Sequence, residues 1–495
     1  MNYVSTRGGT TANDNLHSAD AIKQGLANDG GLFMPVSVPQ VSMEEIVALS
    51  AKSYPERAAA ILGKFLDDYP AEELLSYCES AYAEDRFPGG AAPLHKLGDT
   101  VHVMELWHGP TCAFKDMALQ IMPKLLSGAL RITGEKREAF ILVATSGDTG
   151  KAALEGYADV DQVRIMVYYP VDGVSRMQKL QMATQEGKNV TVCAIRGNFD
   201  DAQTGVKKIF SDPDAAAELE KNGCFFSSAN SINWGRLVPQ VAYYFSAYCD
   251  LLAQGEIQPG EEINVSVPTG NFGNIFAGYL AKEMGLPVKR FLCASNKNNI
   301  ITDFLNTGVY DRNRAFYTTM SPSMDILISS NLERLLYLKT GCEMTAAYMK
   351  SLNETGAYTV DADVKAAIDE SFCGYFADEE MTADTIKNTM ERFGYLADTH
   401  TAVALSAAEQ YIEKTGDRKP MVVASTASPY KFAADVYTSL YGEAPESALA
   451  ALDLLSAKSN TEIPYPLKGI GDRTVRFTDV IPSADMWEAV RRYIG

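Results

Sequence analysis

One lysine in the segment 110–116 has neighbours that favour chemistry at its amine. Lys115 follows Phe114 and precedes a helical pattern of apolar residues over 117–126. Because apolar neighbours disfavour the charged ammonium form, such an amine can act as a nucleophile and form a Schiff base with a carbonyl compound. A solvated lysine at the start of a helix is the alternative, and the local sequence alone favours it.

A glycine-rich loop follows a predicted strand over 263–267 and precedes a predicted helix over 275–284. It contains Gly270, Asn271, Phe272, Gly273 and Asn274. Glycine allows positive φ and close approach of the backbone, and the N–H groups at the start of a helix favour negative charge. A phosphate monoester fits such a loop. An ordinary strand-to-helix turn is the alternative, and the spacing is not that of the GxGxxG dinucleotide motif.

A second polar loop, residues 145–151, follows a predicted strand over 139–144. It is not a P-loop, because Thr145 and Ala152 stand where that pattern requires Gly and then Ser or Thr. Its hydroxyl and amide groups at the start of a helix suit a carboxylate. For Asp148, the local sequence favours a simple helix cap.

A third segment, residues 230–236, combines amides, a hydroxyl and a cation. Asn230, Ser231 and Arg236 precede an apolar run over 237–244. Arginine with neighbouring donors suits a phosphate dianion. An amide-rich cap on the following helix is the alternative.

The elements that must position these residues alternate between strands and helices, which predicts parallel α/β sheets. In such sheets ligands collect at the carboxyl ends of the strands. We expect a mainly helical region over 1–90, a smaller α/β domain with the lysine over 91–225, and a larger α/β domain over 226–495. The stretch 310–399 is expected to be mainly helical. The predicted strands are 101–106, 139–144, 163–169, 189–195, 263–267, 288–294 and 421–425.

The composition limits the classes of function. The 495 residues are 46% hydrophobic and 22% charged, which is typical of two or three globular domains. The net charge of −19 argues against binding of nucleic acid or an anionic membrane surface. Eight cysteines without a CxxC pair indicate reduced thiols in the cytoplasm, and five histidines without HxxxH spacing give little support for a metal site. No secretory signal or membrane-spanning run is evident.

Taken in order, these segments resemble the fold-type II pyridoxal-phosphate enzymes, the tryptophan synthase β family, and most closely the threonine synthases. Further segments support the resemblance: 5–8, 25–32, 105–111, 321–326 and 330–334. The resemblance implies two parallel or mixed α/β domains with pyridoxal 5'-phosphate in the cleft, beside an N-terminal helical region.

The resemblance also implies residue roles. Lys115 matches the lysine that holds the cofactor and moves protons, next to Phe114. The loop Gly270, Asn271, Phe272, Gly273 and Asn274 matches the site of the cofactor phosphate, and Thr426 matches a hydroxyl facing the pyridine nitrogen. Ser146, Gly147, Asp148 and Thr149 match a substrate-carboxylate loop, and Asn230, Ser231 and Arg236 match a substrate-phosphate site.

Two positions depart from the family pattern. The motif Thr-Ala-His-Pro reads Thr426-Ala427-Ser428-Pro429 here, so the role of that histidine is absent or is supplied elsewhere, for which His400 is a candidate. Asp148 stands where many relatives have Asn. A carboxylate there would repel the carboxylate of a substrate, so we expect the Asp148 side chain to be turned away or to cap its helix.

The implied activity is that of a lyase with a phosphate leaving group. It converts O-phospho-L-homoserine and water to L-threonine and phosphate, the last step of threonine biosynthesis. A serine/threonine dehydratase or a cysteine synthase is the nearest alternative, and its substrates carry no γ-phosphate, so the segment of Arg236 discriminates. A non-catalytic phosphate- or amino-acid-binding protein is an alternative of another class. Whether the protein is a monomer or a homodimer stays open.

Overall fold

The computed structural model describes residues 1–172 and 174–494. Its largest element is a six-stranded sheet in the order β13-β10-β9-β14-β4-β3, in which only β3 is antiparallel to its neighbour. Its strands are β3 (Leu94–Leu97), β4 (Val101–Glu105), β9 (Ile263–Pro268), β10 (Val288–Ser295), β13 (Phe372–Phe376) and β14 (Met421–Ser425).

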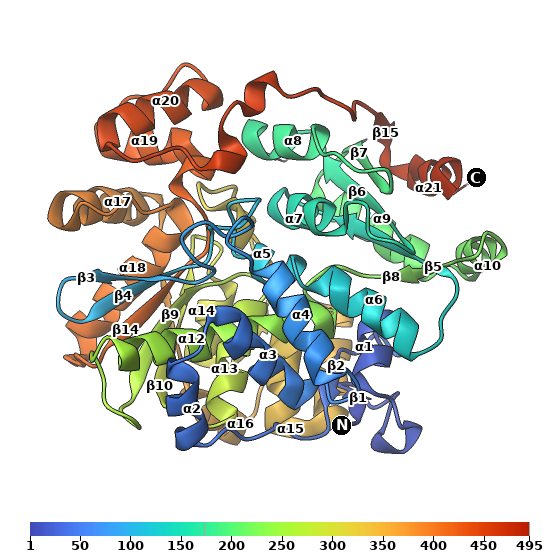
Figure 1. Ribbon diagram of the computed structural model, residues 1–495, viewed down its shortest axis with the longest axis horizontal. Helices are drawn as coiled ribbons and strands as arrows, with labels where there is room; N and C mark the ends of the chain where they lie inside the picture. Colours follow the sequence, from blue (N-terminus) through green and yellow to red (C-terminus); the bar gives the residue numbers. More distant parts are fainter. Residues whose placement is uncertain (173, 495) are drawn as a thin grey trace.

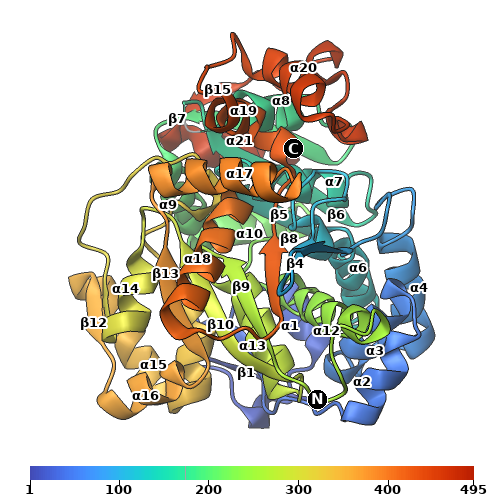
Figure 2. The ribbon, with the colours of Figure 1, turned by 90° about the vertical axis from the view of Figure 1, so that its left-hand side faces the viewer.

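A second sheet has five parallel strands in the order β15-β7-β6-β5-β8. It lies above the six-stranded sheet in Figures 1 and 2. Its strands are β5 (Glu138–Ala144), β6 (Val163–Pro170), β7 (Val190–Arg196), β8 (Cys224–Ser227) and β15 (Val480–Pro482).

Helices cover both faces of each sheet, which explains why the central strands are apolar without a break. In β5, Ile141 packs into one hydrophobic cluster with α7, and Phe140 packs into another with α9 and α21. In the larger sheet, α18 covers one face and α12 and α13 the other. The helices named here are α7 (Asp148–Tyr157), α9 (Phe199–Phe210), α12 (Pro239–Ala253), α13 (Gly273–Glu283), α18 (Thr399–Thr415) and α21 (Met486–Ile494).

The N-terminal region is helical, as its pattern predicts. Ser42 and Ser53 each begin a helix with a capping box, because Glu45 and Glu56 follow three residues later. The helices are α1 (Ser18–Gln24), α2 (Met43–Ser50), α3 (Tyr54–Phe65) and α4 (Ala71–Ala81), beside the antiparallel pair β1 (Tyr3–Ser5) and β2 (Phe33–Pro35).

One expectation about local structure is wrong, and another leaves out several strands. The helix expected over 117–126 is split into α5 (Asp116–Leu119) and α6 (Met122–Ile132), because Pro123 lacks an N–H and starts a new helix. The stretch 310–399, expected to be mainly helical, contains strands as well as helices. It contains β13 at the edge of the large sheet, and β12 (Ala357–Thr359), which pairs with β11 (Val309–Asp311), besides α15 (Leu332–Thr355), α16 (Ala362–Asp369) and α17 (Glu379–Phe393).

The chain passes between the two sheets more than once. The strands β3 and β4, from the predicted smaller domain, pair within the larger sheet, and β15, from the predicted larger domain, pairs with β7. The division at residues 90 and 225 therefore does not follow the strand pairing, and it stays a prediction. The remaining helices are α8 (Arg176–Ala183), α10 (Pro213–Lys221), α11 (Trp234–Leu237), α14 (Ile300–Thr307), α19 (Ala433–Tyr441) and α20 (Ala448–Ser459).

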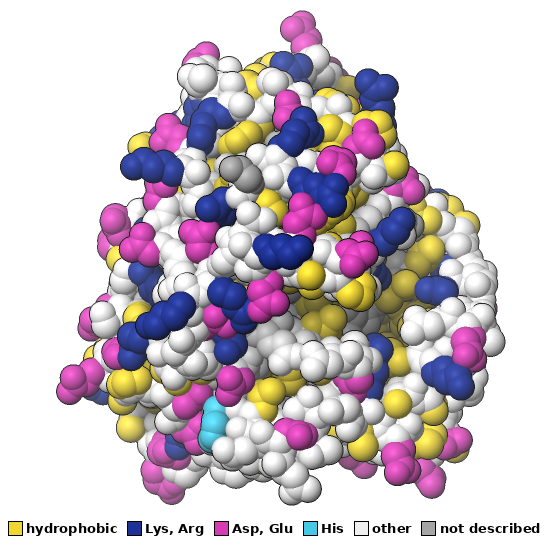
Figure 3. Space-filling view, turned by 90° about the vertical axis from the view of Figure 1, so that its right-hand side faces the viewer, with side chains coloured by type: hydrophobic (Ala, Val, Ile, Leu, Met, Phe, Trp, Pro, Cys, Tyr) yellow, Lys and Arg dark blue, Asp and Glu magenta, His cyan; other side chains and the backbone are white. Residues whose placement is uncertain are grey.

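On the face drawn in Figure 3, acidic and basic side chains are interspersed. The described residues form no large basic patch on that face. Among residues 1–172 and 174–494, no helix has both the length and the hydropathy that crossing a membrane would require.

Candidate active site

Lys115 lies at the N-terminal end of α5. This helix contacts α7, which packs on the five-stranded sheet, and α12, which packs on the six-stranded sheet. The segment of Lys115 is held against the chain that leaves β14: the Phe114 N–H donates to the Thr426 carbonyl over 2.8 Å, and Ala113 forms a bridge with Ala427. Only 14% of the Lys115 side chain is exposed. Burial lowers the pKa of Lys115 to about 8, with added repulsion from nearby cations. The neutral amine is therefore more accessible near neutral pH than in an ordinary lysine.

The carboxylate of Asp148 faces this amine. Its Oδ2 lies 3.8 Å from Lys115 Nζ and accepts from the Ser323 hydroxyl over 2.7 Å. Its Oδ1 lies 2.8 Å from Lys431 Nζ and accepts from Gln178 Nε2 over 2.9 Å. Burial alone would raise the pKa of Asp148, but the two lysines and these donors hold it well below its usual range.

The expectation that the Asp148 side chain turns away or caps its helix is wrong. The N-cap residue of α7 is Gly147, and no side chain caps that end. The carboxylate instead turns toward Lys115, because two lysines supply the positive charge that a buried carboxylate needs.

The loop before α7 leaves backbone donors open. Thr145 Oγ1 accepts from the N–H groups of Gly147 and Gly150, each over 2.9 Å. No described residue accepts from the N–H of Asp148 or Thr149. Gly147 has φ 135°, and a Cβ there would collide with the amide of Gln178, so this turn requires glycine. The open donors at the start of a ten-residue helix suit an anion such as a carboxylate.

The loop between β9 and α13 also leaves backbone N–H donors without an acceptor among the described residues. Phe272 has φ 61° and is the N-cap residue of α13. Asn274 Oδ1 is fixed by the Thr269 hydroxyl at 2.6 Å and by the Ile275 N–H at 2.9 Å. The described residues provide no acceptor for the backbone N–H groups over 271–274. These groups could hold a phosphate at the start of the helix.

The segment 230–236 lies beside this loop. A Cβ on Gly273 would lie 3.7 Å from Cβ of Ser231 and 3.2 Å from Nδ2 of Asn331. Arg334, which is fully buried, donates to the Ile232 carbonyl over 2.7 Å and also to the Phe33 carbonyl over 3.3 Å. This arginine therefore ties the segment to both α15 and the N-terminal region.

Arg236 is buried, and it forms no ion pair with a carboxylate among residues 1–172 and 174–494. Its Nη1 donates to the Ala229 carbonyl over 2.9 Å, and its Nε has no acceptor among the described residues. Burial lowers the pKa of Arg236 to about 10, while Tyr157 and Asp116 act in the opposite direction. An arginine remains charged at that pKa, so a buried guanidinium with an open donor is suited to an anionic ligand.

Thr426 follows β14 and is buried. Its carbonyl holds the Phe114 N–H, and no described residue forms a hydrogen bond with its hydroxyl. The preceding Ser425 is fixed by Trp107 Nε1 at 3.0 Å and by the Thr401 hydroxyl at 2.9 Å. The structure thus places Thr426 beside the Lys115 segment.

Three residues that contact Asp148 were not predicted as site residues: Ser323, Gln178 and Lys431. Ser323 lies in one of the segments that carried the family resemblance. The signal for Lys431 was its place between Tyr430 and Phe432, an apolar setting like that of Lys115. Nothing in the local sequence pointed to Gln178, because its contact with Asp148 depends on how α8 packs against α7.

The histidine of the usual motif has no counterpart at Ser428, whose hydroxyl accepts from the Tyr430 N–H. His400 is buried and hydrogen-bonds with Ser323, a residue that also binds Asp148. Its Nε2 accepts from the Ser323 N–H over 3.2 Å, and its Nδ1 lies 2.8 Å from Asp398 Oδ2. His400 therefore contacts the residue that contacts Asp148, and whether it replaces the missing histidine stays a prediction.

Family models account for nearly the whole chain. Residues 88–427 match the pyridoxal-phosphate dependent enzyme family, residues 2–82 match the threonine synthase N terminus, and residues 401–494 match the threonine synthase C-terminal family. The chain belongs to the threonine synthase family. The predicted fold-type II class and the pyridoxal-phosphate cofactor are thereby confirmed.

Individual relatives agree with this family. Threonine synthase of Pseudomonas aeruginosa is 37% identical over 94% of this chain and 95% of its own length. Threonine synthase-like 1 of Homo sapiens is 39% identical over 89% of this chain, but the chain spans only 60% of that relative's length. The crystal structure of pyridoxal-phosphate-bound threonine synthase from Brucella melitensis has a TM-score of 0.86 at 38% identity and covers 99% of this chain and 98% of its own.

The residues present fit the cofactor of this family. Lys115 offers a largely buried amine, and the loop before α13 offers backbone donors that no described residue uses. The Thr426 hydroxyl is also unused among the described residues, and it belongs to the chain that pairs with the Lys115 segment. A hydroxyl could hydrogen-bond a ring nitrogen, but because it is not acidic it cannot enforce a protonated ring nitrogen as a carboxylate does.

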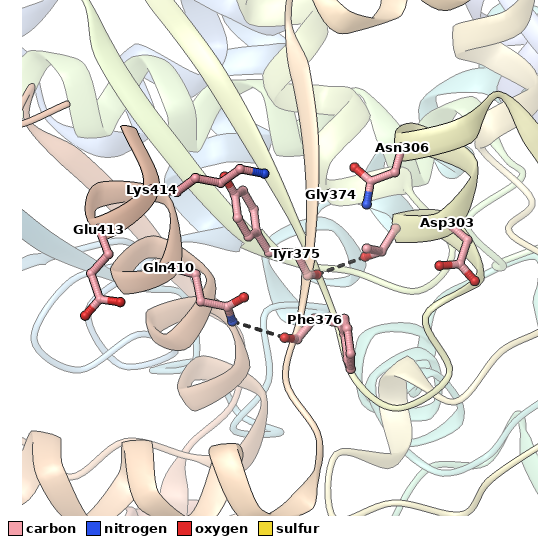
Figure 4. A pocket seen from close by; sticks show the side chains of 9 residues that line it. Asp303, Asn306, Gly374, Tyr375, Phe376, Gln410, Glu413 and Lys414 are labelled. Carbon is pink, nitrogen blue, oxygen red and sulfur yellow. Dashed lines mark hydrogen bonds between the residues drawn. The ribbon is translucent and has the colours of Figure 1, made fainter. Parts of the chain in front are cut away.

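A separate hollow lies at the outer edge of the large sheet (Figure 4). It is lined by residues of α14, β13 and α18, among them Asp303, Tyr375 and Lys414. The Gln410 amide donates to the Phe376 carbonyl across it over 3.1 Å. None of its lining residues is a predicted site residue.

Proposed function

We propose that this protein is a threonine synthase that converts O-phospho-L-homoserine and water to L-threonine and phosphate. The observation that carries the proposal is the arrangement of three groups: the Lys115 amine, the open backbone donors before α7 and α13, and the buried cation of Arg236. A phosphorylated amino acid bound to a phosphorylated cofactor needs one amine partner and three anion sites, and these groups supply them.

Lys115 is proposed as the residue that binds the cofactor and then moves protons. Pyridoxal phosphate, when bound, supplies an electron sink for the charge left at carbon after a proton is removed. With a pKa of about 8, the Lys115 amine is neutral in a useful fraction near neutral pH. It can then take the proton from Cα of the amino acid. Asp148, 3.8 Å away, is placed to stabilise the ammonium that forms.

Each of the three anion sites binds a different anionic group of the cofactor or the substrate. The N–H groups over 271–274 hold the cofactor phosphate, and Ser146 with the N–H groups of Asp148 and Thr149 holds the substrate carboxylate. Arg236, with Asn230 and Ser231, holds the substrate phosphate. Because that phosphate is remote from the first proton transfer, its binding energy can orient the reacting atoms.

Arg236 also separates this proposal from a dehydratase or a cysteine synthase. Their substrates carry no γ-phosphate, so a buried guanidinium with an open donor would have no ligand there. A non-catalytic binding protein would not need the amine of Lys115 to be held next to a paired carboxylate.

The test is a direct assay with the purified protein. O-phospho-L-homoserine should give phosphate and L-threonine in equal amounts, measured by a molybdate assay and by chromatography. L-serine and L-threonine serve as controls and should give little 2-oxo acid. Rapid deamination of these controls, or no release of phosphate, would refute the proposal.

We further infer that the protein works in the cytoplasm on a small-molecule substrate. The support is that all eight cysteines are free thiols, six of them buried, because reduced thiols are typical of the cytoplasm. Fluorescence microscopy of a tagged chain in its own host checks this inference.

A further inference from the structure

A second lysine lies in the same polar network as Lys115. Lys431, in the short helix η3 (Pro429–Phe432), has 0% of its side chain exposed. Its ammonium lies 2.8 Å from Asp148 Oδ1 and donates to the Thr111 carbonyl over 2.9 Å. A buried charge is costly unless it is paired. Among the described residues, Lys431 has its ion pair with a single carboxylate, that of Asp148, which also faces Lys115.

Asp148 is shared between the two lysines. Its Oδ2 faces Lys115 at 3.8 Å, and its Oδ1 faces Lys431 at 2.8 Å. An isolated carboxylate beside Lys115 would stabilise the ammonium and leave few neutral amines. Lys431 opposes this effect in two ways, because it neutralises the carboxylate and because its own charge disfavours a proton on Lys115.

The other charged groups near Lys115 do not replace Lys431. Arg236, from α11, adds repulsion but makes no ion pair with Asp148. Asp116, on the helix of Lys115 itself, is bound to the N–H and hydroxyl of Thr111, at 2.8 and 2.7 Å.

We propose that Lys431 is a positioning residue that keeps Lys115 available as a neutral amine, by holding and neutralising the carboxylate of Asp148. The inference rests on the proposed role of Lys115 in binding the cofactor. Lys431 also binds the carbonyl of Thr111, whose N–H donates to the side chain of Asp116, the residue that follows Lys115. The lowered pKa of Lys115, caused first by burial and then by repulsion from Lys431 and Arg236, agrees in direction.

The reactivity of the Lys115 amine tests this proposal without an activity assay. The full chain is freed of its cofactor with hydroxylamine and labelled briefly with acetic anhydride between pH 6 and 10. Mass spectrometry of the peptide that contains residue 115 then gives the pH at half-maximal labelling. Intact binding of added pyridoxal phosphate and a normal thermal transition show that each variant is folded.

Lys431→Met should raise this midpoint by roughly one pKa unit, so that labelling at pH 7 slows about tenfold. Lys431→Arg, which keeps the charge, should leave the midpoint within a few tenths of the original. Lys151→Met is a matched control. Lys151 is similarly buried, at 7% exposed, and is paired with Glu155 at 2.8 Å, so its loss should not change the midpoint.

An unchanged midpoint in folded Lys431→Met protein would overturn the proposal. The double variant Lys431→Met with Asp148→Asn replaces the ion pair by two neutral groups, and its midpoint should return close to the original. A midpoint of the double variant that stays one unit higher would also overturn the proposal. If Lys431→Met does not fold, the double variant alone tests the proposal. Peptide mapping of the borohydride-reduced holoprotein is separate: cofactor on another lysine would refute the proposed function of Lys115 but not its control by Lys431.

Discussion

The backbone N–H of Ser323 donates to Nε2 of His400 over 3.2 Å. Nε2 is therefore the acceptor, and Nδ1 carries the proton toward Asp398 Oδ2 at 2.8 Å. Because the Ser323 hydroxyl binds Asp148, His400 is linked to the carboxylate that faces Lys115. A buried histidine far from Lys115 in the sequence thus helps to place the donors around the reactive amine.

We expect His400→Ala to lower both stability and turnover. The Ser323 N–H would lose its acceptor, and an unsatisfied buried donor costs about 1–3 kcal/mol. Denaturant unfolding measures the free energy, and kcat and KM are measured with O-phospho-L-homoserine. His400→Gln can still accept at a similar position and should recover part of the loss. Equal losses in the two variants would show that the ring itself matters, through its contact with Phe432.

Lys115→Ala should abolish covalent attachment of the cofactor and turnover. Borohydride reduction of the holoprotein followed by peptide mapping is the measurement. Lys151→Ala provides a control lysine that is also buried but is bound to Glu155. Retention of a reducible adduct in Lys115→Ala would assign the attachment to another lysine.

Gly273→Val should weaken retention of the cofactor while the fold stays intact. A Cβ there would already lie 3.2 Å from Asn331, and the added methyl groups would approach the open donors. The occupancy is measured by absorbance after gel filtration. Gly63→Val is the control, because its Cβ in α3 would meet only Leu74 at 3.9 Å. Normal occupancy in Gly273→Val would contradict a phosphate site at this loop.

Arg236→Ala should affect the choice of substrate more than binding of the cofactor. Loss of one charge-assisted contact costs roughly 1.5–3 kcal/mol, which is on the order of 10- to 100-fold in kcat/KM at about 1.4 kcal/mol per tenfold. The loss should appear with O-phospho-L-homoserine and not in slow reaction with an unphosphorylated amino acid. The spectrum of the bound cofactor should not change. An altered spectrum would instead place Arg236 near the bound cofactor, at the loop before α13 that lies beside Ser231.

Attachment of pyridoxal phosphate to the cofactor-free protein should depend on pH through Lys115. Its pKa is lowered to about 8, chiefly by burial. Since only the neutral amine attacks, the rate should rise about tenfold per pH unit below pH 8 and level off above it. Stopped-flow absorbance measures the rate. A rate that kept rising to pH 10 would mean an amine with the ordinary pKa of lysine.

The sequence predicted those features that depend on local patterns. The strand over 421–425 is found with the same bounds as β14, and Lys115 was singled out by its apolar neighbours. Features that depend on packing were missed. The strand β13 follows a helix-rich stretch, and its place at the sheet edge depends on pairing with β10, which is far away in the sequence. The orientation of Asp148 was misjudged because two of its partners, Ser323 and Lys431, are 175 and 283 residues away in the chain.

The pairing of β15 with β7 sets a condition on how this protein folds during its synthesis. β15 begins only at Val480, so one edge of β7 has no partner until almost the whole chain has left the ribosome. An unpaired strand edge is a template for aggregation. A chain cut short before Val480 would keep Lys115 and every predicted site residue, and would still expose that edge. We therefore expect C-terminal truncation to cost solubility before it affects the chemistry of the site.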